Sequence, residues 1–119
     1  MDLNRLIKKI YGESVFITGG SGESIQSSIK LHNVSTLQST NVEEFVLDFL
    51  LDLQECEYRL VVLEMINIAN NNYDKITLEV RCRHTSRTFK KIYYFNITGC
   101  RAVDLAFDYS SSGIKRSNK

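Results

Sequence analysis

The chain has 119 residues, with 15 Lys and Arg against 14 Asp and Glu, so its formal net charge is +1. This length fits a single domain with one hydrophobic core, and a charge near zero argues against a general polyanion-binding protein. The chain contains no apolar run long enough to span a bilayer and no basic-then-apolar secretory signal at its start. We therefore expect a cytoplasmic protein that has no membrane partner.

The first third of the chain predicts a helix followed by a β-hairpin. Residues 2–11 carry apolar side chains at i, i+3, i+4 and i+7, which is typical of one helix face, and Gly12 ends that helix. Residues 14–18 are β-branched and aromatic and predict a strand. Alternation over residues 25–31 favours a second strand. A short helix is the alternative there, because two isoleucines in this stretch are four residues apart.

The Gly-rich segment at residues 19–22 follows a predicted strand, as a phosphate-binding loop would. It lacks the Gly-Lys-Ser/Thr of a P-loop, and Ile25 occupies the position of the third glycine of a dinucleotide fingerprint. Glu23 would also repel a phosphate. The segment therefore predicts a structural turn, and no cofactor is expected.

A long amphipathic helix is predicted after the polar connector at residues 33–39. Thr40 and Glu43 have the spacing of a capping box, which places the start of the helix at Thr40. The face expected to cover the sheet carries six apolar residues: Val42, Phe45, Val46, Phe49, Leu50 and Leu53.

The segment from Tyr58 to Ala69 is apolar at both alternating sets of positions. This pattern predicts a strand that is covered on both faces or lies in the middle of its sheet. Strands at residues 76–84 and 89–97 follow. Residues 102–109 predict a last strand, with a short helix as the alternative.

These elements predict one α+β domain at residues 1–109, followed by a flexible, basic, Ser-rich tail at residues 110–119. The expected architecture is an N-terminal helix, a β-hairpin and a long amphipathic helix packed on a mainly antiparallel sheet that ends in a meander.

Charge is segregated along the chain, which predicts a charge dipole that either reflects complementarity within the molecule or steers a partner. Four acidic residues form one ridge on the solvent side of the long helix, and this ridge is the expected partner-binding surface: Glu44, Asp48, Asp52 and Glu55. Four basic residues on the later strands form the alternative surface: Arg81, Arg83, Lys90 and Lys91. The basic residues also suggest a nucleic-acid-binding module at residues 80–91 as a second hypothesis, although nucleic acid is not the favoured partner.

No catalytic or metal-binding group is expected. The chain has only two histidines, His32 and His84, and its three cysteines are odd in number and widely spaced, which indicates free thiols. Carboxylates in a row on an exposed helix face lack the burial that separates an acid from a base. A small enzyme or ligand carrier with a pocket lined by Tyr93 and Phe107 is a third hypothesis.

Several short segments resemble a family of small bacterial immunity proteins, which act in contact-dependent growth inhibition and related polymorphic toxin systems. They are Ile17–Ile25 with the spaced Ile29, Tyr73–Ile76 and Ile92–Ile97, and together they span roughly residues 14–97. This chain has Asn96 where the family pattern has Asp. The resemblance implies a cytosolic antidote that binds one cognate toxin domain and blocks it, and a nuclease is the toxin that would best suit the acidic ridge. It assigns no functional residue and leaves the oligomeric state open.

Overall fold

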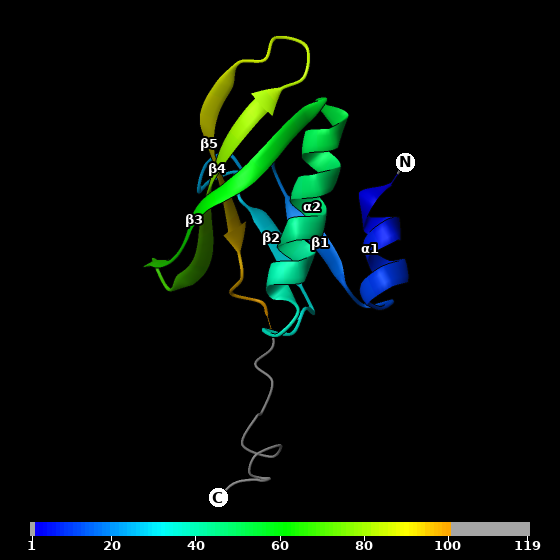
Figure 1. Ribbon diagram of the computed structural model, residues 1–119. Coiled ribbons are helices and arrows are strands. Elements are labelled where there is room, and N and C mark those ends of the chain that lie inside the picture. Colours follow the sequence, from blue (N-terminus) through cyan, green and yellow to red (C-terminus); the bar gives the residue numbers. More distant parts are fainter. Residues whose placement is uncertain (1, 101–119) are drawn as a thin grey trace, which may run out of the picture.

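The structure, a computed structural model, describes residues 2–100, which form two helices and five strands (Figure 1). The elements are α1 (Leu3–Tyr11), β1 (Phe16–Gly19), β2 (Ile29–His32), α2 (Ser39–Leu53), β3 (Cys56–Ile68), β4 (Asn71–Cys82) and β5 (Thr88–Asn96). The expected α+β class is confirmed. The predicted last strand at residues 102–109 and the predicted tail at residues 110–119 lie outside the described part of the chain.

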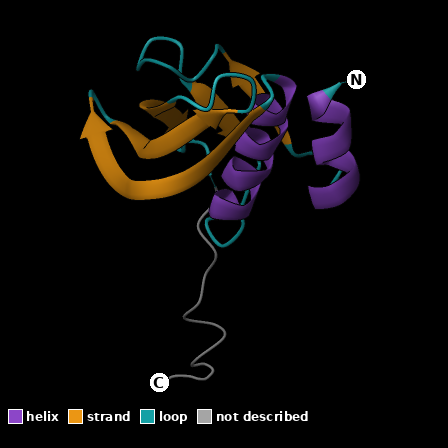
Figure 2. Cartoon of the chain, turned by 45° about the horizontal axis from the view of Figure 1, so that its top comes forward, coloured by secondary structure: helices purple, strands orange, loops and turns teal. Residues whose placement is uncertain are grey.

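The five strands form one sheet in the order β1-β2-β5-β4-β3. The meander of β3, β4 and β5 is antiparallel throughout, and β1 pairs antiparallel with β2. The sheet is nevertheless mixed, because β2 and β5 pair in parallel after α2 and the β3–β4 hairpin have brought the chain back. The two helices lie side by side next to the sheet, and the long β3–β4 hairpin curves away from them (Figure 2).

Helix α1 has the predicted start and end. Asp2 is its N-cap, and the carboxylate accepts the backbone N–H of Asn4 at 3.0 Å. Gly12 ends the helix with a φ of +129°, a conformation that glycine adopts without a steric penalty. Ile7 is fully buried and attaches the helix to the core.

The β1–β2 hairpin is confirmed, but its second strand is shorter than predicted, because residues 20–28 form a loop. The backbone N–H of Gly22 donates to the carbonyl of Ser27, and its own carbonyl accepts the N–H of Tyr94, each at 2.7 Å. The loop is therefore folded against β5. Gly22 has a φ of +85°, and a Cβ there would lie 3.0 Å from the Tyr93 ring, so the loop requires a glycine at this position.

Helix α2 exists as predicted, but its start and its buried face differ from the prediction. The N-cap is Gln38, which makes no capping hydrogen bond with its side chain, and Thr40 lies inside the helix. Glu43, which a capping box would leave at the surface, is only 1% exposed. The sheet-facing residues are therefore not the expected set. Those that are buried are Ser39, Val42, Glu43, Val46, Leu47 and Leu51.

The apolar residues of α2 serve two neighbours, which explains the wrong prediction of its buried face. Phe45 packs edge-on against Tyr11 of α1, with ring centroids 6.0 Å apart. Phe49 is half-buried, and Leu53 is 68% exposed. Because α1 and the sheet both contact this helix, apolar periodicity alone does not identify the face that covers the sheet.

The core lies where the inner faces of β2, β4 and β5 meet α2. The strand residues that are at least 97% buried in this core are Ile29, Leu31, Ile76, Leu78, Val80, Tyr93 and Phe95. Strand β4 has the alternating burial that its sequence predicts, with one apolar face turned inward.

Strand β3 contradicts the prediction of a central strand covered on both faces. It is an edge strand that pairs only with β4, and most of its residues are exposed. Leu60 is 53% exposed and Met65 is 76% exposed. Its double-sided apolar pattern therefore lacks the cover within the described chain that such a pattern normally has.

Leu60 of β3 and Leu78 of β4 are directly opposite in register. Because β3 is at the edge and β4 is inside the sheet, truncating the two side chains should lower the stability of the fold by different amounts. Leu78→Ala empties a fully buried site and should lower the free energy of unfolding by about 2–5 kcal/mol. Leu60→Ala, at an exposed site, should lower it by less than about 1 kcal/mol. Urea unfolding of dilute protein measures both. Equal losses would mean that β3 is not an edge strand in solution.

Candidate functional site

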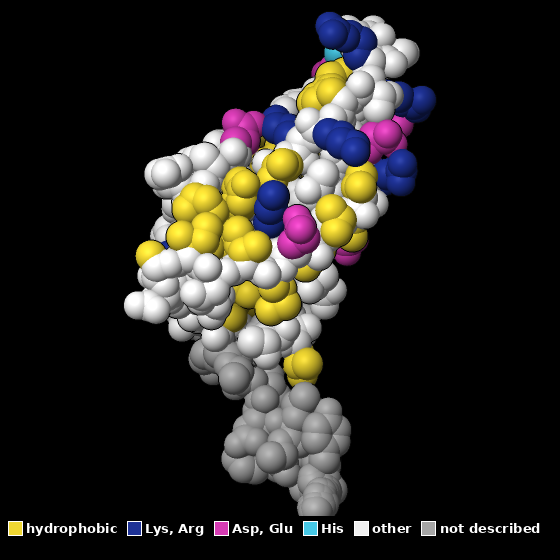
Figure 3. All heavy atoms as spheres, turned by 90° about the vertical axis from the view of Figure 1, so that its left-hand side faces the viewer, with side chains coloured by type: hydrophobic (Ala, Val, Ile, Leu, Met, Phe, Trp, Pro, Cys, Tyr) yellow, Lys and Arg dark blue, Asp and Glu magenta, His cyan; other side chains and the backbone are white. Residues whose placement is uncertain are grey.

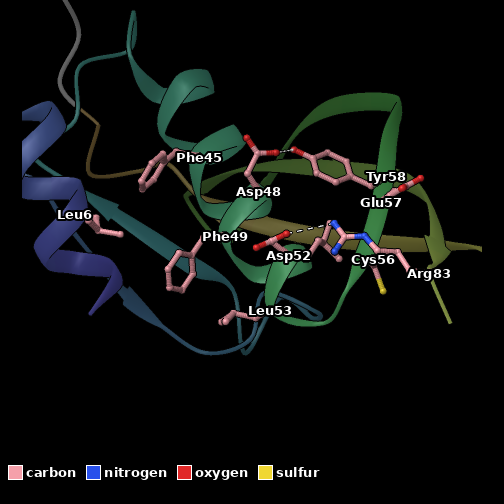
Figure 4. A pocket seen from close by; sticks show the side chains of 11 residues that line it. Leu6, Phe45, Asp48, Phe49, Asp52, Leu53, Cys56, Glu57, Tyr58 and Arg83 are labelled. Carbon is pink, nitrogen blue, oxygen red and sulfur yellow. Dashed lines mark hydrogen bonds and ion pairs between the residues drawn. The ribbon is translucent and has the colours of Figure 1, made fainter. Parts of the chain in front are cut away.

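An open cleft of about 690 Å³ lies between α1, the C-terminal half of α2, the start of β3 at Cys56 and Arg83 in the turn after β4. Figure 4 shows that side chains of two different kinds line it. The lining residues are Leu6, Phe45, Asp48, Phe49, Leu51, Asp52, Leu53, Cys56, Glu57, Tyr58 and Arg83. The cleft therefore brings together members of the predicted acidic and basic surfaces.

One wall of the cleft is apolar. In Figure 4, Phe45 and Phe49 of α2 lie toward Leu6 of α1, and Leu53 lies at the end of the helix. Both phenylalanines are half-buried and line the cleft, so part of each side chain is available to a partner. Partly exposed aromatic side chains beside a cavity are typical anchors of protein–protein interfaces.

The other wall is charged and hydrogen-bonded. The Tyr58 hydroxyl donates to the Asp48 carboxylate, and an Arg83 Nη lies 3.3 Å from an oxygen of Asp52 (Figure 4). Burial, together with the neighbouring Asp48 carboxylate, raises the pKa of Tyr58 above its ordinary value. Tyr58 is therefore a neutral hydrogen-bond donor at physiological pH, held in place at the charged wall of the cleft.

The structure places the predicted acidic ridge on the surface, as expected, but three of its four members have partners within the chain. Glu44, Asp48 and Asp52 are exposed residues of α2. Glu55 lies beyond the helix, at a φ of +58°, and pairs with His84 of the β4–β5 turn. Glu44 has no ion pair with the residues that the structure describes.

The basic residues are paired as well, so the expected separation of charge is wrong. Arg81 contacts Glu57 at 3.0 Å, and Lys91 contacts Glu23 at 2.7 Å. Lys90 is opposite Glu79 in the β4–β5 register. Positive and negative side chains therefore alternate on the sheet, and Figure 3 shows them interleaved with hydrophobic side chains over one face of the molecule.

These ion pairs within the chain contribute little to its stability, because their side chains are exposed to solvent. The side chains of Arg83 and Asp52 are 47% and 75% exposed, and those of Arg81 and Glu57 are 60% and 56% exposed. Solvent-exposed ion pairs of this kind contribute about 0–1 kcal/mol each. A partner that offers a better geometry can therefore displace them at small cost.

Sequence reasoning missed the buried carboxyl of Glu43. Neither of its oxygens has a hydrogen-bond partner among the described residues. Burial, and then the neighbouring Asp74, raise the pKa of Glu43 to about 10, so it is protonated and neutral at pH 7. One signal was present in the sequence, because Glu43 precedes the buried Leu47 and Leu51 by four and eight residues and so shares their helix face.

Sequence reasoning also missed a thiol pair, since Cys56 and Cys82 are directly opposite on β3 and β4. Their Sγ atoms lie 3.6 Å apart, and both thiols are free. Burial and the adjacent Cys82 raise the pKa of Cys56, which lowers its reactivity at neutral pH.

Within residues 2–100, no group of three or more His, Cys, Asp or Glu side chains could hold a metal ion. Neither described helix combines the length and the apolar character needed to cross a membrane.

Comparison of the chain with protein-family models, with curated proteins and with solved structures finds no match.

The raised pKa of Glu43 predicts how stability depends on pH. In the unfolded chain this carboxyl loses its proton near its ordinary pKa of 4.5, whereas in the folded protein it keeps the proton up to about pH 10. The folded state therefore binds one more proton than the unfolded state between these values, and this group makes stability fall as pH rises. The slope is at most about 1.4 kcal/mol per pH unit.

Glu43→Gln should remove this contribution, because the amide does not titrate. We expect the difference in free energy of unfolding between variant and wild type to shift in favour of the variant between about pH 5 and about pH 8, as urea titrations would show. Glu44→Gln, at the exposed neighbouring position, is the control and should keep the wild-type slope. Parallel pH profiles for wild type and Glu43→Gln would contradict the burial of a protonated carboxyl.

Proposed function

We propose that this protein binds another protein through the cleft beside α2, and that this partner is a toxin domain that it neutralises. The partner surface would be basic with apolar or aromatic side chains between the charges, as in the nucleic-acid-binding cleft of a nuclease. The acidic side chains Glu44, Asp48 and Asp52 would face its positive groups. The toxin as partner rests on the resemblance of residues 14–97 to bacterial immunity proteins, and the contact surface rests on the geometry of the cleft.

The observation that carries the proposal is the joining of two kinds of contact at one place. Asp48 and Asp52 line the same cleft as Phe45, Phe49 and the exposed Leu53. An interface of this composition has apolar anchors that lose water on binding and a charged margin that selects the partner. Complementary charge raises the association rate and excludes wrong partners more than it adds affinity, and both effects suit an antidote.

The internal ion pairs are compatible with this function. Because each exposed pair contributes about 0–1 kcal/mol, Asp52 can exchange Arg83 for a basic group of the partner with little loss. The freed Arg83 would then be available to a carboxylate of the same partner. The cleft would thus recognise a surface of mixed charge that is predominantly basic.

The two other hypotheses receive less support from the structure. Three of the four basic residues proposed for nucleic acid are already in contact with carboxylates, which would repel a phosphate backbone. Tyr93, proposed to line an enzyme pocket, is 1% exposed and belongs to the core. Phe107, its proposed companion, lies outside the described residues.

The decisive experiment tests any toxin domain encoded beside this protein. We expect the purified proteins to form a complex, and co-expression to restore the growth of cells that make the toxin. Asp48→Asn combined with Asp52→Asn should weaken the complex about tenfold or more, mainly through a slower association that becomes less sensitive to salt. Surface plasmon resonance at two ionic strengths would measure both effects.

The matched control is Glu13→Gln combined with Glu79→Gln, which removes two negative charges that lie outside the cleft and keeps both cleft aspartates. It should bind nearly as the wild type does. If both double variants bind equally well, the cleft is not the contact surface. If no adjacently encoded toxin domain binds at micromolar concentration, the proposed function itself is wrong.

A further inference from the structure

Beyond Tyr58, the exposed edge of β3 takes no part in the cleft. Its outer side has no neighbour among the described residues, although the strand runs from Cys56 to Ile68. Hydrophobic side chains are exposed along it: Leu60, Val61, Val62, Leu63, Met65 and Ile68. A long apolar edge strand presents unpaired backbone N–H and C=O groups, and natural proteins usually cover or blunt such an edge.

The sequence at the middle of this edge is self-complementary. Residues 59–64 read Arg-Leu-Val-Val-Leu-Glu, so the four apolar residues are the same in either direction and the two ends carry opposite charges. When two such strands run antiparallel, with the symmetry axis between Val61 and Val62, Leu60 of each faces Leu63 of the other. Arg59 of each then faces Glu64 of the other.

A bulge in β3 makes this pairing sterically consistent. Val61 is the extra residue, because Leu60 is opposite Leu78 and Val62 is opposite Thr77. Without a bulge, positions 60 and 63 would point to opposite faces, since side chains alternate along a strand. With it, Leu60 and Leu63 share one face, opposite Leu78 and Ile76, and Arg59 and Glu64 share the other.

A twofold axis perpendicular to a sheet requires that paired residues lie on the same face, because it maps each face onto itself. The register just described meets this condition for the leucine pair and for the Arg59–Glu64 pair. Both copies carry the same extra residue, so residues 60–63 of one copy pair one to one with residues 60–63 of the other. A bulge that would misalign an ordinary partner strand is therefore matched by a second copy.

The neighbouring strands extend the complementarity into two rows across the combined sheet. Arg59 contacts Glu79 at 2.8 Å, and Glu64 contacts Lys75 at 3.9 Å. Joining Arg59 to Glu64 of a second copy gives a charged row that alternates in sign throughout: Lys90, Glu79, Arg59, then Glu64 and Lys75 of the second copy. The apolar row is Leu78, Leu60, then Leu63 and Ile76 of the second copy.

We propose that two copies of this protein associate through their β3 edges, antiparallel, about a twofold axis between Val61 and Val62, to form one continuous sheet. The charges select this arrangement, because in-register parallel pairing would place Arg59 against Arg59 and Glu64 against Glu64. The small apolar groove of about 70 Å³ between α2 and β3, to which Leu47, Leu60 and Leu63 contribute, lies beside this contact.

The test is a charge complementation between two variants of the full chain, followed by sedimentation equilibrium. Arg59→Glu brings carboxylates face to face in both pairs of the dimer, and Glu64→Arg brings guanidinium groups face to face. We expect wild-type protein to dimerise in a concentration-dependent way and each variant alone to self-associate at least tenfold more weakly. An equimolar mixture of the two variants should form a heterodimer with affinity near that of the wild type, because both pairs are then of opposite charge.

The mixture distinguishes a lost contact between copies from a lost contact within one chain. Each variant keeps its disrupted within-chain ion pair in the mixture, so a restored affinity can only come from the contact between copies. Arg81→Glu is the matched control. It disrupts an exposed pair with Glu57 within the chain, as Arg59→Glu disrupts one with Glu79, but lies on β4 away from the axis, and it should dimerise as the wild type does.

A wild-type chain that stays monomeric up to its solubility limit would overturn the proposal, and the edge would then belong to a strand of some other protein. Dimerisation that neither variant weakens, or that the mixture fails to restore, would overturn it equally. None of these outcomes depends on the toxin, so the dimer and the proposed function stand or fall separately.

Discussion

The packing of α2 on the inner face of β4 and β5 is the contact on which the rest of the structure depends. Leu78, Val80 and Phe95 are fully buried there, in one core cluster with Val46 and Leu51 of the helix. Burial of side chains of this size contributes about 1.5–3 kcal/mol each. The short strands β1 and β2 and the helix α1 complete this core. Strand β3 pairs with β4 alone and also contacts α2, for example through the hydrogen bond from Tyr58 to Asp48.

This contact also buries a carboxyl group of the helix. Glu43 is buried on the sheet-facing side of α2 and is kept neutral by its surroundings, with Asp74 nearby. Burial of a carboxyl without hydrogen bonds is unfavourable, and protonation is the response that avoids a far larger penalty for a buried charge. The pKa of the Cys100 thiol is raised mainly by burial and further by the nearby carboxyls of Glu43 and Asp74. The polar groups at this end of the core therefore influence one another.

The sequence predicted those parts of the fold that depend on local chemistry. Asp2 and Gly12 bound α1 because capping and positive φ are properties of a few adjacent residues. The existence of α2, the β1–β2 hairpin and the antiparallel meander followed from periodicity. The site was predictable only in part: Glu44, Asp48 and Asp52 lie exposed on the helix as expected, but their partners across the chain did not follow from their spacing.

What could not be predicted depends on non-local contacts. Phe45 and Phe49 were predicted to face the sheet because the sequence does not indicate that α1 packs beside α2. The single bulge at Val61 shifts the β3–β4 register by one residue. Only with that shift do Cys56 and Cys82 become opposite and do Arg59 and Glu79 form a pair. A one-residue change in register reassigns every cross-strand contact beyond it, so the charge pairs that neutralise the sheet were invisible to reasoning from charge runs.

The double-sided apolar pattern of β3 still carries physical information, although the strand is at the edge. A strand that is apolar on both faces and unpaired at its edge is usually covered by another part of the protein or by a partner. Residues 2–100 of this chain do not supply that cover. A second copy provides it in one register that also satisfies the charges of Arg59 and Glu64. In both ribbon views α2 stands between β3 and α1 (Figures 1 and 2), so the cleft wall formed by Leu6 and Phe45 lies on the far side of the helix from the paired edge. Two copies joined about an axis between Val61 and Val62 would leave this apolar wall free. They would meet the cleft only at its charged wall, where Cys56, Glu57 and Tyr58 belong to the start of β3.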